Sequence, residues 1–231
     1  MENTVKIKNN KAFTLAEVLI TIGIIGVVAA MTIPTLLSNY TKKRTITKLQ
    51  RAISVLNQAY RQSVDDVGDS IDEAYNMGTE NYINTYWAPY IKINQICKTY
   101  SDCGYKSNTP FYNTDGKTLQ GSAAFIQNSR IGIRTMDGFT YIIFTSNWKA
   151  GEFNIPTNWV WVDLNGSAAP NTFGKDVFFL LRVEDKGVMP YGYDQPQSYI
   201  DTNCKQQTQG ATCAEKIRRA GWVIDKSYPW K

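Results

Sequence analysis

The first quarter of the chain carries two hydrophobic patterns in succession. Residues 18–37 are twenty residues without a charge, apolar on all sides of a helix and long enough to cross a bilayer. From Ile46 to Val64 apolar residues recur at steps of three and four, so they occupy one face, and basic residues lie on the remaining surface. We predict one long helix over residues 13–66, transmembrane over 13–37 and amphipathic over 38–66.

The later part of the chain predicts a β-sheet. Residues 131–144 (IGIRTMDGFTYIIF) hold two β-rich runs around an Asp-Gly turn, which is a strong hairpin signal. Residues 158–164 (NWVWVDL) and 175–183 (KDVFFLLRV) predict two further strands, and a short helix is expected near 82–91. We therefore predict an α+β fold, with a four-stranded antiparallel sheet packed on the amphipathic half of the helix and a globular part over residues 67–231.

Composition argues against nucleic-acid binding and against catalysis. The net charge of +5 arises in residues 1–66, with nine Lys/Arg against four Asp/Glu, whereas the rest of the chain holds sixteen of each. No nucleic-acid partner is therefore indicated. The chain contains no histidine, GxSxG motif, Walker loop or dinucleotide fingerprint. Its adjacent acidic pairs are typical of a solvated surface, so we expect no enzymatic activity.

Four cysteines fall into two local pairs, Cys97 with Cys103 and Cys204 with Cys213. Neither pair has the spacing of a zinc ribbon, and no histidine completes a metal site. Disulfides outside the cytoplasm are favoured over metal ligands or free thiols. The second pair would close a loop near the carboxyl terminus.

The segment before the apolar run suggests export. Residues 1–12 (MENTVKIKNNKA) are short and basic, and an ordinary secretory signal peptide is one interpretation. However, no A-x-A-like cleavage site follows the apolar run. Instead Pro34 lies near the end of the run, and the helical pattern continues beyond it.

The residues Ala12-Phe13-Thr14-Leu15-Ala16-Glu17-Val18 resemble the processing site of type IV pilins and type II secretion pseudopilins. The resemblance implies a leader peptide over residues 1–12, which a prepilin peptidase removes before Phe13, and N-methylation of Phe13. Glu17 and Pro34 then take positions five and twenty-two of the mature chain, as in that family. Ala12 departs from the usual Gly before the cut. Pro34 is expected to bend the helix, because proline removes a backbone donor and crowds the preceding turn.

Glu17 has two explanations. Thr14-x-x-Glu17 fits a capping box, and a carboxylate in the first turn complements the helix dipole. The resemblance implies instead that Glu17 attracts the amino group of Phe13 on a neighbouring subunit and sets the register of assembly. Both roles can coexist, and a charge inside an apolar segment favours the second.

The topology of the predicted membrane span contains one conflict. The basic cluster over residues 42–44 lies beyond the span, where the positive-inside rule would place the cytoplasm. The processing motif and the predicted disulfides require the opposite orientation, and we give them precedence. We expect a single-pass inner-membrane protein with its head outside the cytoplasm, and then a periplasmic or cell-surface filament.

One loop is a candidate calcium site. Residues 162–176 offer oxygen ligands from Asp163, Asn165, Asn171 and Asp176. Major secretion pseudopilins carry calcium near this place in the fold, whereas the alternative is a turn-rich connection without a metal. No other cofactor is expected.

The resulting functional hypothesis is a filament subunit that self-associates through Phe13–Leu37 and engages a pilus or secretion assembly platform. The disulfide near the carboxyl terminus favours a pilus, whereas the calcium-like loop favours a secretion pseudopilus. A minor or tip subunit that primes or binds is one alternative. A membrane-anchored enzyme or receptor domain is the other.

Overall fold

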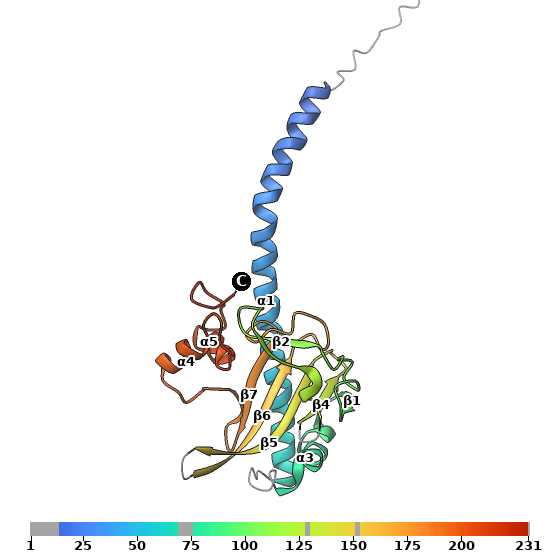
Figure 1. Ribbon diagram of the computed structural model, residues 1–231, viewed down its shortest axis with the longest axis vertical. Helices are drawn as coiled ribbons and strands as arrows, with labels where there is room; N and C mark the ends of the chain where they lie inside the picture. The colour runs from blue at the N-terminus through green and yellow to red at the C-terminus, as the bar shows by residue number, and fades with distance from the viewer. Residues whose placement is uncertain (1–13, 69–75, 128–129, 151–152, 231) are drawn as a thin grey trace, which may run out of the picture. The chain divides into compact units, whose positions relative to one another are not determined.

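The computed structural model describes residues 14–68, 76–127, 130–150 and 153–230. The chain divides into two compact units, Met1–Lys42 and Lys43–Lys231. The helix α1 (Leu15–Val67) contributes its first part to one unit and its second part to the other (Figure 1). The amphipathic half of the predicted helix therefore belongs almost entirely to the globular unit.

The helix α1 is unbroken from Leu15 to Val67 and agrees with the predicted long helix. At its carboxyl end Gly68 adopts a φ of +81°, and its N–H donates to the carbonyl oxygen of Val64 at 3.0 Å. Glycine reaches this left-handed conformation without steric cost and so ends the helix. Pro34 lies inside α1, and the bend expected there stays a prediction.

A six-stranded antiparallel sheet with strand order β1-β4-β5-β6-β7-β8 forms the centre of the globular unit (Figure 1). Its strands are β1 (Ile93–Cys97), β4 (Arg130–Thr135), β5 (Thr140–Ala150), β6 (Phe153–Asp163), β7 (Val177–Val183) and β8 (Gly187–Pro190). The sequence predicted the four inner strands and the α+β class correctly. The predicted number was wrong because β1 and β8 are short edge strands, with polar residues or proline in place of a β-rich pattern.

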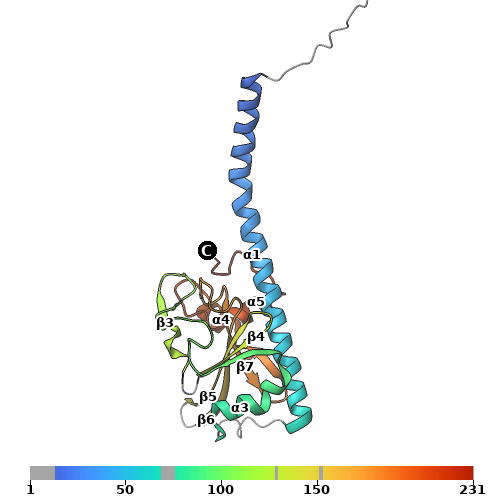
Figure 2. The ribbon, with the colours of Figure 1, turned by 90° about the vertical axis from the view of Figure 1, so that its right-hand side faces the viewer.

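One face of the sheet packs on the second part of α1 (Figure 2). Leu49, Ala52 and Leu56 lie on one side of the helix at steps of three and four, and each is fully buried. They belong to the same core as the sheet residues Val160 and Leu180, which are also fully buried. The amphipathic pattern of the helix and the alternation of the strands therefore describe the two sides of one interface.

A second core covers the opposite face of the sheet. Ile142 and Phe179 project from the sheet into it, and Phe111, Ile126 and Phe173 cover them. The covering segment contains the two-stranded ribbon of β2 (Pro110–Tyr112) and β3 (Leu119–Ser122), followed by the turn η2 (Ala123–Phe125). Both faces of the sheet are thus largely buried, which explains the continuous apolar run of β7.

Short helices complete the globular unit: α3 (Gly78–Tyr86), η1 (Ala88–Tyr90), α4 (Gln197–Asn203) and α5 (Cys213–Arg219). The expected short helix near 82–91 corresponds to the end of α3 together with η1. Arg182 of β7 connects this region to α1, because its guanidinium lies 5.1 Å from the ring of Tyr60 and 4.9 Å from that of Tyr86. These cation–π contacts offset part of the cost of burying the charge.

Candidate functional site: the start of the long helix and the loop between β6 and β7

The first turn of α1 contains a reciprocal cap. The backbone N–H and the hydroxyl of Thr14 both donate to Glu17 Oε2, at 2.8 and 2.9 Å, and the N–H of Glu17 donates to Thr14 Oγ1 at 3.2 Å. This is the capping box that the sequence predicts. The exposed Oε1 of Glu17 accepts no hydrogen bond from the part of the chain that the structure describes. The cap therefore leaves one carboxylate oxygen available to a partner.

The helix that follows exposes apolar side chains on every side. Leu19, Ile25 and Met31, which lie about 120° apart around a helix of 3.6 residues per turn, are 62%, 66% and 73% exposed. Among the described residues, α1 is the one helix long and apolar enough to cross a membrane. Such a surface is unstable in water, so it requires lipid or copies of itself.

The loop between β6 and β7 gathers two buried carboxylates. Asp163 Oδ2 accepts the hydroxyl of Tyr105 at 2.8 Å, and its Oδ1 accepts the N–H of Asn165 at 3.1 Å. Asp176 accepts the N–H groups of Asn171 at 2.9 Å and Thr172 at 2.6 Å. Burial, followed by the charge of Asp176, raises the pKa of Asp163, and burial raises the pKa of Asp176. Burial therefore disfavours the charged form of both carboxyl groups unless a proton or a cation compensates the charge.

Asn171 makes this cluster a test of cation binding. Its side-chain amide lies 3.1 Å from the carbonyl oxygen of Ala168 and 3.3 Å from Asp163 Oδ2. With its nitrogen toward them, the amide donates to both and the loop is complete without a metal. This orientation gives both oxygens a donor, so Asn171 needs no cation. Asn165 Oδ1 is also buried and lacks a partner in the described residues.

The donors of this loop are oxygen atoms, which is the type of ligand that calcium prefers. The four residues of the candidate loop, Asp163, Asn165, Asn171 and Asp176, lie close together, and the Ala168 carbonyl joins them, while calcium binding stays a prediction. Oxygen donors of this type suit calcium, which takes six to eight of them. No group of three or more acidic, His or Cys side chains occurs within the described residues, so any cation would depend on neutral oxygens. Tyr105, 58 positions before Asp163, gave no signal in the sequence.

Two models of known protein families match the chain, one near its amino terminus and one over the rest. The model of the prokaryotic N-terminal methylation motif matches residues 7–33. A second model, described as a family of unknown function (DUF6613), matches residues 35–231. The chain belongs to this second family. Neither the curated proteins nor the solved structures give a match to the chain.

The methylation-motif match confirms the resemblance to type IV pilins and pseudopilins. The motif implies processing by a prepilin peptidase and assembly into a pilus-like filament, and it suggests a structural subunit. The predicted cleavage and methylation site, Ala12 and Phe13, lies outside the described residues. In this chain, Glu17 and the exposed apolar helix are the structurally described parts of the motif.

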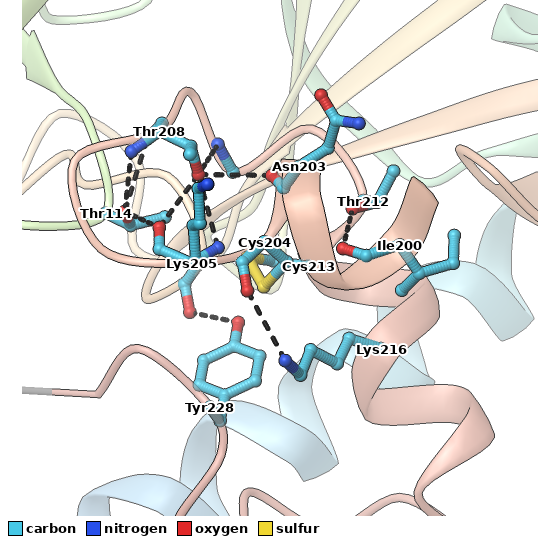
Figure 3. Close-up of a disulfide and its surroundings, with 12 residues drawn as sticks. Thr114, Ile200, Asn203, Cys204, Lys205, Thr208, Thr212, Cys213, Lys216 and Tyr228 are labelled. Carbon is cyan, nitrogen blue, oxygen red and sulfur yellow. Dashed lines mark hydrogen bonds between the residues drawn. A yellow bond between two sulfur atoms is a disulfide. The ribbon is translucent and has the colours of Figure 1, made fainter. Parts of the chain in front are cut away.

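Two disulfides stabilise the family segment, and they join the two pairs expected from the sequence, Cys97 with Cys103 and Cys204 with Cys213. The second joins the end of α4 to the start of α5 (Figure 3). The intervening loop is also tied to Thr114, whose hydroxyl donates to the carbonyl oxygens of Lys205 at 2.6 Å and Thr208 at 3.2 Å. These bonds connect the carboxyl-terminal region to the turn between β2 and β3.

Proposed function

We propose that the chain is a structural subunit of a type IV pilus-like or type II secretion pseudopilus filament. It is inserted in the inner membrane as a prepilin and cut between Ala12 and Phe13, and the new terminus is N-methylated. An assembly platform then extracts the subunits, whose segments over Phe13–Leu37 pack together as the filament core. The globular unit lies outside the cytoplasm, and the finished filament is periplasmic or on the cell surface.

The observation that carries this proposal is the chemistry of the segment 14–37. A helix with apolar side chains exposed on all sides fits both lipid and a bundle of identical helices. It carries one charge, Glu17, of which one oxygen is held by Thr14. An anchor alone does not require that carboxylate, whereas register-specific packing of identical helices does.

The experiment that tests this proposal is mass spectrometry of the amino-terminal peptide, from sheared surface material and from membranes of the native host. Methylated Phe13 abundant in the sheared fraction is the result expected for a surface filament. Methylated Phe13 confined to the envelope would assign the subunit to a secretion pseudopilus or to a minor position. An intact Met1 terminus in both fractions would refute processing, and with it the proposed function.

A minor or tip subunit is the second candidate, because the globular unit has a surface hollow suited to a ligand. Abundance separates the two. A major subunit should greatly outnumber its partners in purified filaments, whereas a priming or binding subunit should be present at a few copies per filament.

We also propose calcium as the cation of the loop between β6 and β7, held by Asp163, Asn165, Asn171, Asp176 and the Ala168 carbonyl. Calcium would neutralise the two buried carboxylates and fix the loop. The support is the burial of two neighbouring carboxyl groups, Asp163 and Asp176, together with the unpartnered Asn165 Oδ1.

Calcium at 1 mM, in place of a chelator, is therefore expected to raise the unfolding temperature of the full chain in detergent by about 5 °C. A ligand at about 100 times its Kd stabilises the folded state by about 2.7 kcal/mol. Thermal unfolding followed by circular dichroism measures the shift. Magnesium is the control ion, because it demands smaller, octahedral geometry.

Asp163→Asn is the matched variant for this experiment. It keeps the size of the side chain and removes the charge, so it is expected to abolish the calcium-dependent shift. In the presence of chelator the same variant should unfold close to the wild-type temperature, because removal of a buried carboxyl offsets the loss of one acceptor for Tyr105 or Asn165. If calcium does not change the unfolding temperature, hydrogen bonds alone hold the loop and the calcium proposal is refuted.

A further inference from the structure

An aromatic hollow lies on the face of the sheet that points away from α1. Strand pairing places Phe144 opposite Trp159 and Trp161 opposite Phe179, so these four side chains project from the same face. With Tyr191, they line a hollow of about 500 Å³. This volume suits a small ring compound or a short oligomer of one.

The rings of the hollow form a partly exposed stacking surface. Trp159 and Tyr191 are half-buried, with centroids 4.7 Å apart and planes inclined by 31°. Phe144 lies parallel to Trp159 at 6.2 Å, with an angle of 4° between the planes. Phe179 is 3% exposed and closes the floor. The rings therefore pack on one another and leave a partly exposed aromatic surface for an occupant.

Polar groups also line this aromatic surface. Thr145, Tyr199, Asn203 and Gln209 contribute hydroxyl and amide groups to the lining. The indole Nε1 of Trp161 is buried and has no acceptor within the described residues. The hydroxyls of Thr145 and Tyr199 already pair with Thr79 and Tyr191. An apolar occupant would leave the Trp161 Nε1 without an acceptor, whereas an occupant rich in hydroxyls would supply one.

The hollow carries a single charge. Arg130 is the one charged residue that lines it, and the guanidinium lies 5.5 Å from the centroid of the Phe144 ring. In the described part of the chain Arg130 is exposed and forms no ion pair. A guanidinium fixed beside an aromatic surface is suited to a carboxylate on a stacked ligand.

We propose that this hollow binds a pyranose unit of a glycan and prefers an acidic sugar. A pyranose has one apolar face of C–H groups, which stacks on Trp159 and Tyr191, and a rim of hydroxyls for the surrounding amides and hydroxyls. The carboxylate of an acidic sugar pairs with Arg130. This function is additional to filament assembly, and it does not depend on whether the chain assembles.

The test is a titration of the full chain in a detergent without a sugar headgroup, since a maltoside or glucoside would compete. The probes are tetrasaccharides of glucose, galactose, mannose, N-acetylglucosamine, galacturonic acid and glucuronic acid. Tryptophan fluorescence and calorimetry are expected to show saturable binding, with a Kd of about 1 mM or below, of at least one of them. The acidic probe should bind more tightly than its neutral counterpart.

Three variants make the result specific. Trp159→Ala should weaken binding at least about tenfold by removing the stacking surface. Arg130→Gln lies on the exposed rim, so it preserves packing and should remove the preference for the acidic probe. Tyr193→Ala removes a half-buried aromatic side chain outside the hollow and should bind as the wild type does. Equal unfolding temperatures would show that the variants are folded.

Two outcomes would overturn the inference. The first is that no probe saturates at about 20 mM, a concentration far above the Kd expected for a built site. The second is that the chain self-associates in the absence of sugar and that Trp159→Ala abolishes the association, because the occupant of the hollow would then be a second copy.

Discussion

Replacing Glu17 with leucine is expected to abolish incorporation of the chain into filaments while the protein still accumulates in the membrane. Leucine is a good helix former, so α1 persists, and the apolar segment becomes more apolar. What is lost is a carboxylate whose Oε1 is free of the Thr14 cap and can attract a neighbour's amino group in a medium of low dielectric. Immunoblots would measure the ratio of the chain in sheared material to the chain in membranes. This ratio should fall at least about tenfold.

Glu17→Gln separates the two roles of this side chain. Glutamine is accepted at the same position of a capping box, so the bonds with Thr14 can be kept while the charge is removed. If Glu17 acts by charge pairing, the glutamine variant fails to assemble as the leucine variant does. If it acts as a cap, the glutamine variant assembles normally, and leucine costs only about 1 kcal/mol of helix stability. Normal assembly of the glutamine variant would refute the pairing role, whatever the leucine variant does.

The long helix could be predicted from the sequence because its signals are local. Twenty uncharged residues, a three- and four-residue repeat and Gly68 each act within a few turns, and the observed bounds follow them. The inner strands were predictable for a similar reason, since their alternation or apolar runs reflect burial on one or both faces. The edge strands β1 and β8 gain their structure from pairing with β4 and β7, which no local pattern encodes.

The candidate sites likewise divide into contacts that are local in sequence and contacts that depend on the fold. The capping contact between Thr14 and Glu17 spans three residues and was legible in the sequence. The contact between Tyr105 and Asp163 joins segments 58 residues apart and required the fold. The aromatic hollow could be predicted from the sequence only in part. The alternation of Trp159 and Trp161 along the sequence places them on one face of a strand. That face is open beside Tyr191 because the cover over the sheet is incomplete there.

Replacing Cys204 and Cys213 together with alanine is expected to lower the free energy of unfolding by about 2.5 kcal/mol. The two residues are nine positions apart, and a cross-link closing a loop of that length limits the unfolded chain by about this amount. Both cysteines are fully buried, so alanine is preferred to serine, whose hydroxyl would need a partner. Urea unfolding of the full chain in detergent measures the change.

The single variant Cys213→Ala provides the control, because it breaks the same bond and should cost about as much as the double variant. The bonds from Thr114 to the carbonyl oxygens of Lys205 and Thr208 do not depend on the disulfide (Figure 3). They would hold the loop in the folded state of both variants. Both variants should therefore be less stable than the wild type but keep its fold. A loss below about 1 kcal/mol would mean that these bonds, and that of Tyr228 to Gly174, already confine the carboxyl-terminal region without the cross-link.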